Sequence, residues 1–134
     1  MILVDSSVWI DYLRGVSSPA SDKLDSLLGV APLAVGDLIV TEVLQGCNSE
    51  QEFAAVRRAL GALDFIVLGG AEIAVQAAQN YRKLRSLGIT VRKTIDTIIA
   101  TRCIVDGLEL LHSDQDFEPF ATHLGLRCVH YDVR

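Results

Sequence analysis

The sequence predicts an α/β fold, a three-layer α/β/α sandwich with a mainly parallel central sheet. Two observations carry this prediction. Short apolar segments recur along the 134 residues, and a helical pattern separates each segment from the next. Short continuous runs of apolar residues are typical of strands that helices cover on both faces. Strands that alternate with helices are joined by right-handed crossovers and lie parallel.

The first predicted strand covers residues 1–5 and ends in a carboxylate. Four apolar residues precede Asp5, and a turn and an amphipathic helix over residues 6–13 follow it. We therefore expect Asp5 at the carboxyl end of a strand, facing a helix amino terminus. Open α/β sheets bind their ligands at this place.

The rest of the first half continues the alternation. A break rich in Gly, Ser and Pro at residues 15–19 precedes the next elements. Helices are expected over residues 21–28, 37–46 and 50–61, and a short strand over residues 31–35. Gly36 and Asp37 are expected to cap the second of these helices. Ser49 and Glu52 have the spacing of a capping box for the third.

The second half is predicted from the same signals. Strands are expected over residues 65–68, 108–112 and 127–130, and helices over residues 70–87, 94–107 and 116–124. Thr94 is the predicted cap of the second of these helices. No repeat or linker interrupts the pattern, so a single domain over residues 1–134 is expected.

The composition and the net charge argue against several classes of protein. Half of the residues are hydrophobic, but no apolar run approaches the ~20 residues that cross a bilayer, so we expect no membrane segment. The amino terminus does not resemble a signal peptide, which predicts a cytoplasmic protein. A net charge of −5 argues against binding nucleic acid through bulk positive charge. Bound metal cations would change that sign locally.

Carboxylates stand at two predicted strand ends. Asp5 follows the first strand, and Asp114 and Asp116 follow the strand over residues 108–112. The carboxyl ends of parallel strands lie at one edge of a sheet, so these side chains are expected close together.

Two further acids lie on helix faces that should pack. Glu42 has Leu38, Ile39 and Gly46 as its neighbours one turn away, and Asp96 shares a face with Ile99. A buried charge without a partner is costly, so each needs a compensating group.

Taken singly, most of these acids are explained as helix caps. Asp5 and Asp96 lie at predicted helix starts, where the helix dipole favours negative charge, and Ser113 with Asp116 resembles a capping box. Their conjunction fits a metal site better, because converging carboxylates repel one another unless a cation binds. Oxygen ligands without His or Cys indicate Mg²⁺ or Mn²⁺. Such a site suits phosphoryl transfer, with metal-activated water as nucleophile.

Four segments together resemble the PIN-domain ribonucleases, specifically VapC-type toxins of bacterial toxin–antitoxin pairs. These segments are Ile2-Leu3-Val4-Asp5-Ser6-Ser7, Val40-Thr41-Glu42-Val43, Ile95-Asp96-Thr97-Ile98-Ile99-Ala100 and Ser113-Asp114-Gln115-Asp116-Phe117. The resemblance covers the whole chain in the same order. It implies a metal-dependent endoribonuclease that hydrolyses RNA phosphodiester bonds, partnered by a cognate VapB-type antitoxin, and a homodimer.

The resemblance also implies roles for individual residues. Asp5, Glu42, Asp96 and Asp114 would bind Mg²⁺ or Mn²⁺, with Asp116 as a further ligand or supporting group. Ser6 matches the hydroxyl that orients the first Asp or a water on the metal. The division of work between Asp114 and Asp116 stays open.

Arg92 and Lys93 directly precede the segment that contains Asp96, and two readings of them are open. They contact RNA phosphate near the metal, or they are solvated loop charges.

Three alternatives to a toxin also stay open: a PIN-fold nuclease of RNA processing, a Mg²⁺-binding phosphotransfer module and a non-catalytic interaction domain. The phosphotransfer module would be of the receiver or the haloacid-dehalogenase kind. A receiver would have a pair of acids after the first strand, and a haloacid-dehalogenase phosphatase would have a second Asp where this chain has Ser7.

Overall fold

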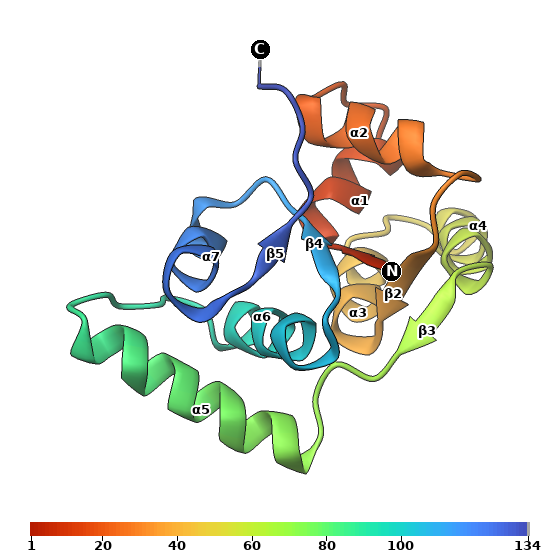
Figure 1. The fold of residues 1–134 in the computed structure, drawn as a ribbon. Helices are drawn as coiled ribbons and strands as arrows, with labels where there is room; N and C mark the ends of the chain where they lie inside the picture. The colour runs from red at the N-terminus through yellow and green to blue at the C-terminus, as the bar shows by residue number, and fades with distance from the viewer. Residues whose placement is uncertain (134) are drawn as a thin grey trace.

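A computed structural model describes residues 1–133, which form a five-stranded sheet between two groups of helices (Figure 1). The elements are, in order, β1 (Ile2–Val4), α1 (Ser6–Leu13), α2 (Pro19–Leu27), β2 (Leu33–Gly36), α3 (Asp37–Gln45), α4 (Glu50–Gly61), β3 (Asp64–Ile66), α5 (Ala71–Ser86), α6 (Thr94–Asp106), β4 (Glu109–Leu111), the 3₁₀ turn η1 (Gln115–Phe117), α7 (Glu118–Leu124) and β5 (Arg127–Cys128). Within residues 1–133, no helix has the length and hydropathy needed to cross a membrane.

The sheet has the order β3-β2-β1-β4-β5, and every pairing in it is parallel. The chain first steps outward from β1 to β2 and β3, and then returns to the other side of β1 for β4 and β5. Right-handed crossovers in opposite directions place α1–α4 on one face and α5–α7 on the other. Figure 1 shows these two groups on opposite sides of the strands, which confirms the predicted three layers.

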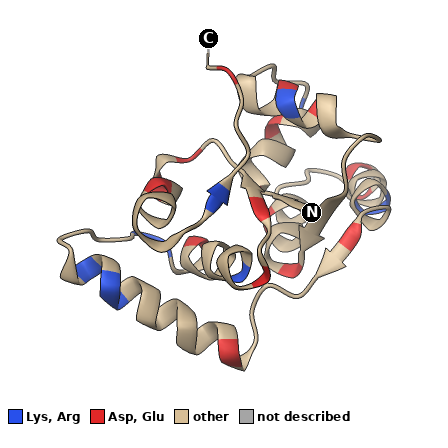
Figure 2. Ribbon diagram, viewed as in Figure 1, with Lys and Arg blue, Asp and Glu red and all other residues tan. Residues whose placement is uncertain are grey.

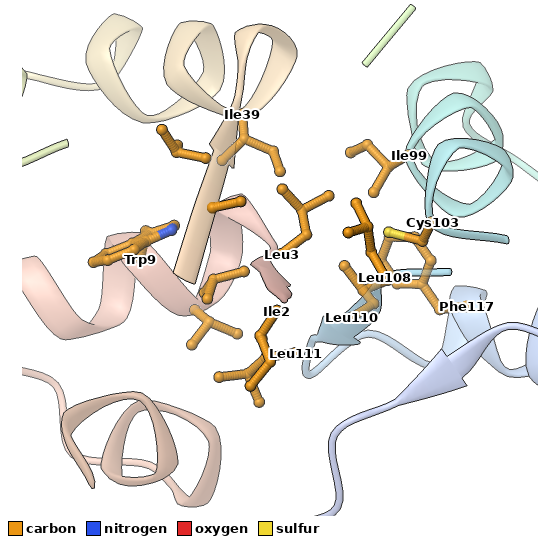
Figure 3. Close-up of a cluster of buried hydrophobic side chains, with 14 of the residues drawn as sticks. Ile2, Leu3, Trp9, Ile39, Ile99, Cys103, Leu108, Leu110, Leu111 and Phe117 are labelled. Carbon is orange, nitrogen blue, oxygen red and sulfur yellow. The ribbon is translucent and has the colours of Figure 1, made fainter. Parts of the chain in front are cut away.

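The core is centred on β1, the middle strand of the sheet, and on its neighbour β4. Leu3 in β1 and Leu110 in β4 are completely buried. Figure 3 shows Ile39 of α3 and Ile99 of α6 approaching Leu3 from different sides. Because both faces of these strands are covered, their apolar runs lack alternation.

The strand β3 differs from its prediction. It covers Asp64–Ile66 where residues 65–68 were expected, and it is not buried: Phe65 is 61% exposed. The reason is its place at the edge of the sheet, where the helices do not cover both faces. An apolar run alone does not distinguish an edge strand from a central one.

Several helix starts also differ from prediction. Helix α2 begins at Pro19 and not at residue 21, because Ser18 caps it: the Ser18 Oγ accepts a hydrogen bond from the Ser21 amide at 3.1 Å. The predicted cap at Thr94 is wrong: Lys93 occupies the N-cap of α6, and its side chain makes no capping hydrogen bond within the described residues 1–133. Residues 116–124 are not one helix but η1 followed by α7.

The predicted caps around α3 and α4 are only partly right. Gly36 occupies the N-cap of α3 as expected. At α4, Ser49 Oγ accepts from the Glu52 amide at 3.0 Å. The Glu52 carboxylate accepts a hydrogen bond from Asn48 N and not from Ser49 N. The second hydrogen bond of a capping box, from the N-cap amide to the Glu side chain, is therefore absent within residues 1–133. The strands β2, β4 and β5 overlap their predicted ranges with shifts of a residue or two.

One loop, after β3, holds two helices in place. The Asp37 carboxylate, in the first turn of α3, accepts hydrogen bonds from its neighbour Leu38 N and from Leu68 N, both at 2.9 Å. On the other side, Arg102 of α6 donates to the carbonyls of Leu68 at 3.1 Å and Gly69 at 2.9 Å. The loop therefore fixes α3 and α6 relative to each other.

Candidate metal centre

The candidate site lies where β1 and β4 end. These neighbouring strands lead into helices on opposite faces of the sheet, which makes their carboxyl ends the topological switch point, the usual ligand site of an open α/β sheet. Asp5 follows β1, and its amide donates to Leu111 O of β4 at 2.9 Å. Asp114 follows β4, so each of these two neighbouring strand ends leads into an acid.

Three carboxylates meet closely at this point. Asp96, Asp114 and Asp116 each offer an oxygen, and these three atoms all lie within 4.8 Å of one another. Asp96 is buried, 7% exposed, whereas the other two are half-buried. The Asp114 Oδ1 accepts a hydrogen bond from Asp116 N at 2.9 Å, which fixes the turn that presents both acids. Asp114, and not Ser113, is the cap of η1.

Asp5 and Glu42 belong to the same electrostatic environment. Burial raises the pKa of Asp5, and the hydrogen bond from Ser7 opposes this shift. The pKa of Glu42 is raised by burial and then by the charge of Asp5. Burial raises the pKa of Asp96 to about 6, with a further contribution from Asp5 and smaller ones from Asp114 and Glu42. The acids therefore repel one another, as the sequence predicted.

Two adjacent serines orient two different carboxylates. The Ser7 Oγ donates to Asp5 Oδ2 at 2.8 Å, whereas the Ser6 Oγ donates to Glu42 Oε1 at 3.2 Å. Of the two roles expected for Ser6, the hydroxyl therefore orients Glu42 and not Asp5, while its role toward a water on the metal stays a prediction. Side chains at a helix start lean toward its amino terminus, so Ser7 reaches back to the N-cap residue Asp5. Ser7 belongs to the segment around Asp5 that resembles the family, but the sequence alone does not reveal its role.

Arg92 and Lys93 border the acidic cluster. The Arg92 Nη2 lies 3.2 Å from Asp116 Oδ1, and the Lys93 Nζ lies 3.8 Å from Asp114 Oδ2. Both basic side chains are largely exposed, so these ion pairs add little to stability. The charge of Lys93 partly offsets the upward pKa shifts of Glu42 and Asp96. Figure 2 shows other basic residues at the carboxyl end of α5, on a different element from the site.

His112 is a further residue of the site that sequence reasoning missed. Its Nδ1 accepts a hydrogen bond from Asp114 N at 3.2 Å, and its ring packs on Phe117 with centroids 4.9 Å apart. Burial lowers the pKa of His112, while the charge of Asp5 opposes this. Since Nδ1 accepts, the proton of the neutral ring lies on Nε2. The position of this His two residues before Asp114 was its only sequence signal.

The donor set fits a divalent cation. The Asp96 Oδ2 is buried and has no hydrogen-bond partner among residues 1–133. Such an atom is costly unless a cation or donor satisfies it. The surrounding ligands are carboxylate oxygens, which hard cations of the Mg²⁺ type prefer. The cluster can therefore hold a divalent metal ion.

Comparison with known proteins gives consistent results. A family model described as the PIN domain matches residues 2–122. The chain is 31% identical to VapC ribonuclease Mb1587 of Mycobacterium bovis and to ribonuclease VapC11 of Mycobacterium tuberculosis. Each of these alignments spans 133 residues and covers 98% of this chain and 99% of the relative.

Solved structures share the fold at lower identity. VapBC2 of Rickettsia felis, bound to a DNA fragment from its promoter, aligns with a TM-score of 0.74 at 17% identity and covers 98% of this chain and 100% of its own. VapC20 of Mycobacterium tuberculosis, described as a sarcin-ricin loop cleaving toxin, aligns with a TM-score of 0.67 at 16% identity, covering 92% and 95%.

Proposed function

Because this chain belongs to the PIN-domain family, we propose that it is a metal-dependent endoribonuclease and the toxin of a toxin–antitoxin pair. The near full-length identity to two VapC ribonucleases supports ribonuclease activity. One observation supports the metal most strongly: Asp96, whose buried Oδ2 has no hydrogen-bond partner among residues 1–133, forms a close group of carboxylates with Asp114 and Asp116. Hydrolysis of a phosphodiester at such a site needs a cation to offset the charge that develops.

The acids are proposed to hold one or more Mg²⁺ or Mn²⁺ ions. Asp5, Glu42, Asp96 and Asp114 would supply the ligand oxygens, and Asp116 would assist them. A bound divalent ion supplies activation of water at neutral pH and neutralisation of the phosphate charge.

The hydroxyl groups and His112 prepare this site. Ser7 and Ser6 hold the carboxylates of Asp5 and Glu42 in fixed orientations through the bonds described above. His112 fixes the backbone at Asp114. Groups that orient ligands in this way typically change metal affinity about 10–100-fold when they are removed.

Arg92 and Lys93 are proposed to contact the RNA backbone. Their side chains are exposed and within 4 Å of the acidic cluster, so a phosphate bound to the metal would lie within their reach. Binding of a metal would also weaken their pairing with Asp116 and Asp114, because the acids would then face a stronger cation. The freed basic groups could position the substrate.

The partners follow from the same proposal. RNA is the substrate, and a cognate VapB-type antitoxin is the inhibitor expected for a VapC-like toxin. A homodimer and a cytoplasmic location remain predictions from the sequence, as does the organisation of residues 1–134 as one domain.

Expression in a bacterial host tests the proposed role. Induction of the wild-type chain should arrest growth and fragment cellular RNA, whereas Asp5→Asn should do neither at an equal protein level. Asp64→Asn is the matched control, because Asp64 is an exposed acid in β3, and it should behave as the wild type. Equal toxicity of the Asp5 variant would refute the proposal.

A further inference from the structure

A pocket of about 390 Å³ opens beside the acidic cluster and is not used by the mechanism above. Its wall comes from α1 and the start of α2, from the loop after β4 together with Glu118 at the start of α7, and from the stretch after β5. Asp114 belongs both to its wall and to the metal cluster. A ligand in this pocket would therefore lie next to a phosphate at the metal.

The charges of the pocket exclude a phosphate as its occupant. Asp11, Asp114 and Glu118 line it, and within residues 1–133 none of its lining residues is Lys or Arg. Burial lowers the pKa of His112 and raises that of Tyr131, and the charge of the nearby Glu118 carboxylate opposes the first shift and adds to the second. The pocket thus presents carboxylate acceptors beside a phenol ring and an imidazole.

Its volume and its aromatic lining suit a flat heterocycle. The Tyr131 hydroxyl donates to His112 O at 2.7 Å, which fixes the phenol ring in the wall. The volume lies in the range of roughly 300–1,000 Å³ usual for small-molecule sites. Single-stranded RNA is recognised by splaying out a base, stacking it on aromatic side chains and reading its edge.

We propose that this pocket binds one unpaired base of the RNA beside the cleaved phosphate, and that it prefers guanine. Guanine is the base that presents two adjacent N–H donors, N1–H and N2–H₂, to a carboxylate. Uracil offers a single N–H between two carbonyl oxygens, which a carboxylate repels. Adenine and cytosine each pair one amino donor with a ring acceptor.

This inference deepens the proposed nuclease function and depends on it, but its binding step can be measured without cleavage. Saturation-transfer NMR on the wild-type chain with Mg²⁺ would compare guanosine, inosine and uridine. Inosine lacks the N2 amino group and should bind on the order of 10-fold more weakly than guanosine, with uridine weaker still. Glu118→Gln should remove the difference between guanosine and inosine. Glu72→Gln, at an exposed acid of α5, is the matched control.

Sequencing the ends of RNA fragments gives the second readout. The wild-type chain should show guanine enriched at one fixed position beside the cut, and Glu118→Gln should reduce that enrichment while cleavage continues. Cleavage without base preference, or equal binding of the three nucleosides, would overturn the guanine pocket and leave the nuclease intact. Binding of arginine amide but of no nucleoside would also overturn it and assign the pocket to a protein partner. Absence of all RNA cleavage would instead refute the proposed function.

Discussion

Replacing Asp96 by Asn should make the metal-free protein more stable while removing its activity. In the folded chain the pKa of Asp96 is raised from 3.8 to about 6, chiefly by burial and then by the charge of Asp5. This difference of about two pH units corresponds to about 3 kcal/mol at ~1.4 kcal/mol per unit. Asp96 is only 7% exposed, so solvent screens little of this electrostatic cost. The Asn amide carries no charge, and it can donate to a neighbouring carboxylate.

The sign of the pH dependence follows from the two pKa values. Below pH 3.8 the Asp96 carboxyl is protonated in both the folded and the unfolded chain, so it has no net effect. Between pH 3.8 and about 6 the unfolded chain loses this proton first, so the free energy of unfolding falls as the pH rises. Above about pH 6 both states are ionised, and the cost stays constant.

Urea unfolding in EDTA at pH 4 and at pH 7.5 measures the effect. Asp96→Asn should exceed the wild type in free energy of unfolding by about 3 kcal/mol at pH 7.5, and the difference should nearly vanish at pH 4. Added Mg²⁺ should stabilise the wild type and not the variant. Asp64→Asn, at an exposed site, serves as the control. A variant less stable than the wild type at pH 7.5, or a pH-independent difference, would refute the reasoning.

Three other predictions concern side chains that hold the site or the loop after β3. Ser7→Ala removes the hydroxyl that bonds the Asp5 carboxylate and should weaken Mn²⁺ binding about 10-fold in a titration; unchanged affinity would show that this bond does not prepare the site. Replacing both Arg92 and Lys93 by Ala should raise the KM for RNA with little change in kcat. An unaltered KM would refute the proposed contact of these side chains with the RNA backbone. Arg102→Ala loses two bonds to loop carbonyls and should lower the free energy of unfolding by roughly 1–3 kcal/mol, measured in urea; a stability equal to that of the wild type would mean that the loop is held by other contacts.

The sequence predicted the sheet because its signals were local. Apolar runs and helical periods recur in order, and the parallel arrangement follows from their alternation. Glu42 stood out because an acid on a packing face is unusual in the middle of a helix, and the structure places it within electrostatic reach of Asp5. The exposure of Phe65 was not predictable, because strand order decides which strand lies at an edge.

Features that depend on the direction of a side chain could not be predicted from the sequence. Ser6 and Ser7 are adjacent and chemically identical, and only the start of α1 decides which of them reaches Asp5. The hydrogen bond between His112 and Asp114 depends on the turn after β4. The pairing of Arg92 with Asp116 joins residues 24 positions apart, and a local pattern does not encode it.

Cleavage of total cellular RNA by the purified chain tests the central claim most directly. The reaction is run with Mg²⁺, with Mn²⁺ and with EDTA, alongside Asp96→Asn and the Asp64→Asn control. We predict cleavage by the wild type and the control that depends on the metal and disappears in the Asp96 variant. Cleavage that persists in EDTA, or that Asp96→Asn retains in full, would contradict the assignment of these acids to a metal-dependent nuclease.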